Sequence, residues 1–228
     1  MIRIAHRGAK REFPENTLPA FLRALERGAD AVELDVHRTK DGLVVVHHDP
    51  VLGVYAGPLG MAGCEITNVT AAELARVEIA PGIAIPSLAD VLDLVGTRMT
   101  VFVEIKGAGI AADVAAVLRG RDTTCAIHSF DHAQIASLVS IAPEIPRGLL
   151  FATPFEDPAG QLARHEARDL WPHWQLVDLR MVAAVHEVGC QVITWTVNDA
   201  DAVLGLEALG VDALCGDDVR LFDEVLAY

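Results

Sequence analysis

Cysteine is scarce in this 228-residue sequence, and its four cysteines lie far apart. None of them belongs to a C-x-x-C pair, which excludes the common thiolate zinc sites and thioredoxin-like redox motifs. Three of the four lie in apolar, strand-like segments, where free thiols are usually buried. We therefore expect unpaired cysteines in a reducing, cytoplasmic setting.

Basic residues are also few: 18 lysines and arginines stand against 32 aspartates and glutamates, and the formal net charge is −14. A protein that binds nucleic acid needs a basic face to neutralise phosphates, so nucleic acid is not an expected partner. The same deficit argues against an electrostatic hold on anionic membranes. Long apolar runs and a secretory signal pattern are missing from the sequence, so stable membrane insertion and export are not expected.

A G-x-G-x-x-G motif is missing after the first strand-like segment, which argues against a dinucleotide-binding doubly wound sheet. The sequence instead alternates short apolar segments with stretches of helical periodicity. Eight segments resemble strands, near residues 3, 33, 103, 126, 149, 170, 193 and 214. Such alternation predicts a parallel sheet, and eight repeats predict a single-domain (β/α)8 TIM barrel over residues 1–228. A doubly wound α/β sheet is the alternative.

Two features interrupt this regular alternation. Asp41-Gly42 is a turn signal after the second strand, and it predicts a β-hairpin whose return arm covers residues 43–47. Residues 51–86 are rich in glycine and proline and are too short to form a domain. We expect them to form a small insertion near the mouth of the barrel.

Acidic and imidazole side chains gather around this hairpin. Residues i and i+2 of a strand share a face, so Glu33 and Asp35 project together. Two neighbouring carboxylates are costly unless a cation compensates their charge. A turn centred on Asp41-Gly42 would bring His48 roughly level with Asp35, while the adjacent histidine would face the other way.

The ordered set of motifs resembles the glycerophosphodiester phosphodiesterase family. The matching pieces are His-Arg-Gly at 6–8, Pro-Glu-Asn-Thr at 14–17, Glu-x-Asp at 33–35, Thr-Lys-Asp-Gly at 39–42, His-Asp at 48–49, Glu-Ile-Lys at 104–106, Ser-Phe at 129–130 and Trp-Thr-Val-Asn at 195–198. They span almost the whole chain in the right order. The resemblance implies a TIM barrel that hydrolyses glycerophosphodiesters to glycerol 3-phosphate and an alcohol, within glycerol and lipid metabolism.

The same resemblance assigns roles to residues at strand ends. It implies a divalent cation held by Glu33, Asp35 and Glu104, general acid–base catalysis by His6 and His48, and substrate contacts from Arg7, Lys106 and Trp195. Oxygen ligands suit Ca²⁺ or Mg²⁺, and the sequence does not choose between them. The nucleophile is either water or the substrate's own glycerol hydroxyl.

Structural roles are the alternative for several polar residues. The three carboxylates could instead form a network with Arg7 and Lys106 that holds the top of the barrel. The family usually has no histidine at the position of His128, so this residue is given a structural role. The family's usual Thr-Asp-x-Pro is replaced near the last strand by Cys-Gly-Asp-Asp, and Asp217 therefore receives no role.

Two other functions are compatible with these motifs. A lysophospholipase D-like or other phosphodiesterase would use the same site, with the glycine-rich loop at 51–63 admitting an acyl chain. A catalytically silent barrel would only bind phosphodiesters, although the complete set of histidines and carboxylates argues against it. The expected partner is a small glycerophosphodiester, and the oligomeric state is left open.

Overall fold

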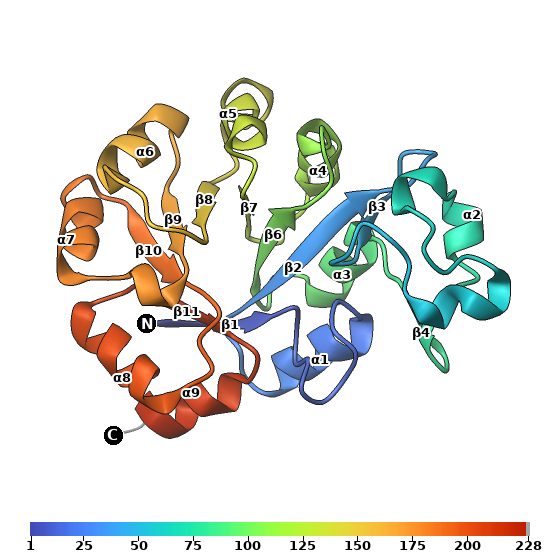
Figure 1. Ribbon diagram of the computed structural model, residues 1–228, viewed down its shortest axis with the longest axis horizontal. Coiled ribbons are helices and arrows are strands. Elements are labelled where there is room, and N and C mark those ends of the chain that lie inside the picture. The colour runs from blue at the N-terminus through green and yellow to red at the C-terminus, as the bar shows by residue number, and fades with distance from the viewer. Residues whose placement is uncertain (227–228) are drawn as a thin grey trace.

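The computed structural model describes residues 1–226, and it contains a closed ring of eight parallel strands with helices around it (Figure 1). Hydrogen bonding between the first two strands of the ring closes it. The barrel strands are β1 (Ile2–His6), β2 (Ala31–Arg38), β6 (Thr100–Ile105), β7 (Cys125–Ser129), β8 (Arg147–Phe151), β9 (Asp169–Pro172), β10 (Gln191–Thr194) and β11 (Ala213–Gly216). The predicted TIM barrel is confirmed.

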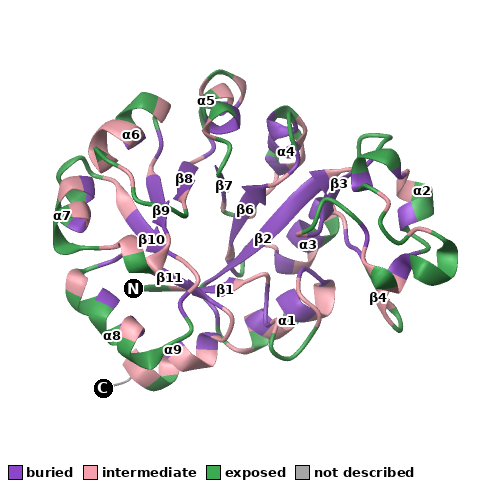
Figure 2. Ribbon diagram, in the orientation of Figure 1, coloured by how far each residue is buried: buried purple, intermediate pink, exposed green. Residues whose placement is uncertain are grey.

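The helices cover the outside of the ring and turn their buried faces toward the strands (Figure 2). They are α1 (Leu18–Glu26), α3 (Leu88–Val95), α4 (Ala111–Leu118), α5 (His132–Ile141), α6 (Pro158–His165), α7 (Leu179–Glu187), α8 (Ala200–Leu209) and α9 (Val219–Leu226), with the 3-10 helix η3 (Trp174–Leu176). The sequence patterns did not include α6. No helix among residues 1–226 is long and apolar enough to cross a membrane.

The predicted hairpin and insertion are both present. Strand β3 (Val44–Val46) pairs antiparallel with the outer end of β2. The insertion then projects to one side of the barrel (Figure 1) and has its own small apolar core. It contains η1 (Val54–Leu59), η2 (Ile66–Asn68), α2 (Ala71–Leu74), β4 (Glu78–Ala80) and β5 (Ile83–Ala84).

The side chains that point into the barrel form a lower apolar layer and an upper polar one. Ile4 and Phe102 belong to the buried cluster inside the ring. Because side chains alternate along a strand, the residues two positions later, His6 and Glu104, point the same way but lie nearer the carboxyl-terminal rim. The same relation to an inward apolar residue holds for Glu33, His128, Trp195 and Asp217. Fold topology thus places these polar groups at one end of the barrel.

Candidate active site

A sharp turn at the end of β1 directs Arg7 across the rim. Arg7 and Gly8 both adopt positive φ angles, 58° and 80°. A side chain at Gly8 would come within 2.8 Å of the Ala20 backbone, so only glycine fits there. Arg7 Nε lies 3.0 Å from Asp35 Oδ2, and its Nη1 donates to Glu15 Oε1 at 2.8 Å. Backbone strain of this kind is typical of functional sites.

Three carboxylates are buried at the centre of the rim. Glu33, Asp35 and Glu104 are only 3%, 0% and 7% exposed, so they have almost no water around them. Asp35 and Glu104 are partners in the register between β2 and β6. Lys106 Nζ lies 2.8 Å from Glu104 Oε1 and 3.6 Å from Asp35 Oδ1. The site therefore confines three acidic groups with two basic side chains.

This imbalance changes the acidity of the carboxyl groups. Burial, with the charge of Asp35, raises the pKa of Glu104 to about 7. Burial and the neighbouring carboxylates raise the pKa of Glu33 well above its usual range. Burial alone would also raise the pKa of Asp35, but Arg7 and Lys106 outweigh it and lower that pKa. Arg7 and Lys106 thus keep Asp35 ionised, whereas for Glu104 burial and the charge of Asp35 outweigh its contact with Lys106.

His6 is held between two acidic residues. Its Nδ1 lies 2.7 Å from Asp217 Oδ1, and its Nε2 lies 4.0 Å from Glu33 Oε2. Asp217 is itself fixed, because Asn198 Nδ2 donates to its other oxygen at 2.9 Å. Burial lowers the pKa of His6, although the bond to Asp217 opposes this. Asp217, which received no role from its sequence motif, therefore orients the His6 ring.

His48 follows the return arm of the hairpin and lies one residue out of the expected register. Val36 pairs with Val46, and His47 N donates to Asp35 O at 2.9 Å, so His47 is the residue level with Asp35. The cause is a three-residue loop rather than a two-residue turn, since Thr39 N donates to Leu43 O.

The two adjacent histidines do not face opposite ways, because the strand ends before them. His48 and His47 line one cavity together with Glu15, Asn16 and Tyr55. The ring of His47 is fixed by Tyr55 Oη at 2.6 Å, whereas His48 is 35% exposed and bonds to Asp49. Only His48 is therefore free to meet a ligand. Asn16 Nδ2 donates to Asp35 Oδ2, which links this cavity to the carboxylates.

Aromatic side chains line the open side of the site. Trp195 faces the central cavity that His6, Glu33 and Glu104 also line. Its Nε1 donates to Trp171 O at 3.0 Å, and Phe130 packs edge-on against its ring at 5.5 Å. Lys106 Nζ lies 5.6 Å from the centre of the Phe130 ring. The predicted substrate residues Arg7, Lys106 and Trp195 thus all reach the rim.

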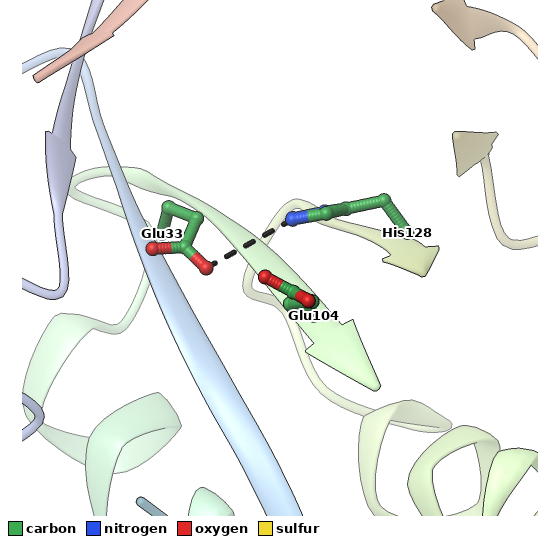
Figure 3. A group of neighbouring side chains, drawn as sticks. All are labelled: Glu33, Glu104 and His128. Carbon is green, nitrogen blue, oxygen red and sulfur yellow. Dashed lines mark ion pairs between the residues drawn. The ribbon is translucent and has the colours of Figure 1, made fainter. Parts of the chain in front are cut away.

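His128 joins the carboxylates, although the sequence motifs gave it a structural role. One ligand atom each from Glu33, Glu104 and His128 lies within 4.8 Å of the others (Figure 3). Glu33 Oε1, which has no hydrogen-bond partner among residues 1–226, lies 3.9 Å from His128 Nε2. Burial lowers the pKa of His128 to about 3. These three side chains form a group that could hold a metal ion, and the excess of carboxylates fits a divalent cation.

Comparisons with known proteins show the family of this chain. The model of the glycerophosphoryl diester phosphodiesterase family matches residues 6–221. This chain belongs to that family. It is 30% identical over 230 residues to a glycerophosphodiester phosphodiesterase of Caldanaerobacter subterraneus subsp. tengcongensis, covering 94% of this chain and 93% of its relative.

Solved structures of the family share the whole fold. A phosphodiesterase of Oleispira antarctica, in complex with the product sn-glycerol-3-phosphate, superposes with a TM-score of 0.91 at 25% identity, covering 100% of this chain and 97% of that one. A glycerophosphodiester phosphodiesterase of Agrobacterium tumefaciens superposes with a TM-score of 0.86 at 27% identity, covering 99% of this chain and 100% of that one. The predicted enzyme class, hydrolysis of glycerophosphodiesters on a TIM barrel, is confirmed by this membership.

Proposed function

We propose that the rim around His6, Glu33 and Glu104 is the active site for glycerophosphodiester hydrolysis, releasing glycerol 3-phosphate and an alcohol. The main support for this proposal is the position of His6. Its Nδ1 is fixed by Asp217, and its Nε2 lies 4.0 Å from Glu33. The product in the Oleispira antarctica relative supports this choice of product for the present chain.

A divalent cation would be held by Glu33, Asp35 and Glu104. Buried carboxyl groups with raised pKa values support this, because a bound cation would compensate their charge. Oxygen donors alone favour Ca²⁺ or Mg²⁺. When bound, the ion supplies Lewis-acid polarisation of the phosphate and charge neutralisation.

We infer that His6 and His48 exchange protons with the substrate. A hydrogen bond from His6 Nδ1–H to Asp217 leaves the lone pair on Nε2, so His6 can accept a proton from the nucleophile, water or a glycerol hydroxyl. His48, whose side chain is 35% exposed, would donate a proton to the leaving alcohol. A general base and a general acid acting in one step predict a bell-shaped dependence of the rate on pH.

The remaining site residues would bind the phosphodiester. The guanidinium of Arg7 and the ammonium of Lys106 would steady charge on the phosphoryl oxygens. Trp195 would form an apolar wall beside the glycerol moiety. We further propose that residues 1–228 act as one barrel domain and that the enzyme is cytoplasmic, a setting that suits four free cysteines.

Chelation followed by metal add-back tests the proposed function. Glycerophosphocholine hydrolysis should fall to background after complete removal of divalent cations and return when a cation is added. A Glu33→Gln, Glu104→Gln double variant should not regain activity when the cation is added. The exposed Glu187→Gln variant is the matched control. Undiminished turnover by the stripped enzyme would contradict the proposal. Parallel assays with lysophosphatidylcholine test the lysophospholipase D-like alternative. That alternative predicts faster hydrolysis of lysophosphatidylcholine than of glycerophosphocholine.

A further inference from the structure

His128 is an imidazole aimed into a cluster of carboxylates. It lies at the end of β7, where Glu104 is its partner in register on β6. Its Nε2 lies 3.9 Å from Glu33 Oε1, and the residue is 1% exposed. Figure 3 shows the ring edge turned toward both glutamates. Two ligands held at about 2.0–2.2 Å from one ion can be at most about 4.4 Å apart, so these atoms need little movement to share an ion.

Neighbouring residues hold the ring in this direction. It stacks on Trp171 with ring centres 4.2 Å apart and an interplanar angle of 11°. Gly148, its register partner on β8, leaves the necessary room, because a Cβ there would lie 2.8 Å from the Trp171 ring and 3.1 Å from His128 Cβ. The barrel wall therefore shapes a slot for an imidazole that points at Glu33.

A purely structural histidine would normally use its ring nitrogens. Buried polar groups are nearly always hydrogen-bonded, because leaving one unpaired costs its full desolvation. His128 Nδ1 has no partner among residues 1–226, and the nearest acidic oxygen to Nε2 is beyond hydrogen-bond distance. His132, by contrast, bonds to Leu150 O at 3.0 Å. His128 Nε2 therefore faces Glu33 without a hydrogen bond, in a cavity that Glu33 and Glu104 also line.

We propose that His128 is a nitrogen ligand of the same cation that Glu33 and Glu104 hold, so that the site prefers a transition-series ion such as Mn²⁺ or Co²⁺ to Ca²⁺. This inference rests on the proposed function for the presence of a cation. Imidazole suits transition metals, whereas Ca²⁺ takes oxygen ligands almost exclusively. One nitrogen donor among the carboxylates therefore shifts the metal preference of the site away from Ca²⁺, which carboxylates alone would accept.

Pulsed electron paramagnetic resonance of the Mn²⁺-loaded enzyme tests the ligand directly. We expect ¹⁴N modulation from a coordinated imidazole, replaced by the ¹⁵N pattern in protein labelled with ¹⁵N-histidine. This readout needs no variant and no activity. Bound Mn²⁺ without any nitrogen coupling would overturn the inference, even if the loaded enzyme hydrolyses glycerophosphodiesters. Nitrogen coupling in a protein without diesterase activity would support the inference and contradict the proposed function instead.

Calorimetric titration then measures selectivity. In His128→Gln and His128→Ala, the Kd for Mn²⁺ and Co²⁺ should rise about 10–100-fold, as for loss of a supporting metal contact. The Kd for Ca²⁺ should change less than about threefold, since it does not depend on nitrogen. His186→Ala, which removes a surface histidine bonded to Asp212, is the matched control. Equal losses of affinity for Ca²⁺ and Mn²⁺ in the His128 variants would refute the assignment of His128 as a selective ligand.

Discussion

The two ends of the barrel bury carboxylates in different ways. At the amino-terminal end, Asp169 begins β9, and the neighbouring Arg168 donates to both of its oxygens at 2.7 Å. At the carboxyl-terminal end, Glu33 Oε1 has no hydrogen-bond partner among residues 1–226, and Glu104 shares Lys106 with Asp35. Asp169 therefore has a base of its own, whereas Glu33, Asp35 and Glu104 together have only Arg7 and Lys106 beside them.

This difference separates stability from function in one fold. A buried charge costs several kcal/mol unless a partner compensates it. Arg168 supplies a partner for Asp169 within the chain, although burial still raises the pKa of that carboxyl group. At the opposite rim, Glu33 Oε1 has no hydrogen-bond partner among residues 1–226, and Lys106 is shared between Glu104 and Asp35. Active sites of TIM barrels lie at the carboxyl-terminal end, where such uncompensated groups are useful. The unequal pairing therefore marks the catalytic end without reference to any motif.

His6→Ala should give the largest effect, and it should lower activity without lowering stability. Removing a general acid–base group typically lowers kcat by about 10²–10⁴-fold. Thermal stability and cation binding should change little, because His6 pairs with Asp217 at the partly exposed edge of the site. Steady-state hydrolysis of glycerophosphocholine measures the loss, with His186→Ala as the control. A variant within threefold of the wild-type kcat would remove His6 from catalysis and favour a binding role.

Arg168→Ala should destabilise the amino-terminal end of the barrel and leave the activity unchanged. It leaves Asp169 buried without its partner, and we expect a loss of about 2–3 kcal/mol in the free energy of unfolding. This is less than for a fully buried pair, because the Arg168 side chain is 41% exposed and partly screened. Urea unfolding measures the change, and kcat well below the melting temperature should stay as in the wild type. A large fall in kcat of the folded variant would mean that the two ends are coupled.

The sequence was sufficient for the barrel because its strands are short apolar runs buried on both faces. The missed α6 has a single buried side chain, Leu162, so it has little periodic signal. Its start was still marked by Asp157, which caps the helix, followed by Pro158 at the first position. Capping chemistry would have found a helix that hydrophobic periodicity does not.

The site shows the same limit at the level of side chains. Glu33 and Asp35 could be found because their relation is local, two residues apart on one strand. His128 and Asp217 act through partners on other strands, Glu33 and His6, and register between strands is set by the closed barrel rather than by local pattern. Relations within one strand were therefore predictable from local pattern, and Glu104 was grouped with them only through the family motifs, whereas the contacts of His128 and Asp217 required the fold.

Glu104→Gln should give the smallest effect and sharpen the contrast between the two ends. The folded protein raises the pKa of Glu104 from 4.5 to about 7. A carboxyl group with a raised folded pKa contributes its full stability below pH 4.5, and this contribution is lost as the pH rises through about 7. The cation-free wild type should therefore lose stability over this interval. The neutral glutamine should make the cation-free variant more stable by about 1–2 kcal/mol at pH 8 and by almost nothing at pH 4.

Thermal unfolding at the two pH values, with and without saturating cation, measures this difference. Cation binding should reverse the order at pH 8, because only the wild type retains all three carboxylates as ligands. Exposed Glu187→Gln should show neither the pH-dependent gain nor the reversal. A cation-free Glu104→Gln variant that is less stable than the wild type at pH 8 would mean that its pair with Lys106 outweighs the repulsion. The charges at the carboxyl-terminal rim would then be as well paired as Arg168 and Asp169, and unequal pairing would not distinguish the two ends of the barrel.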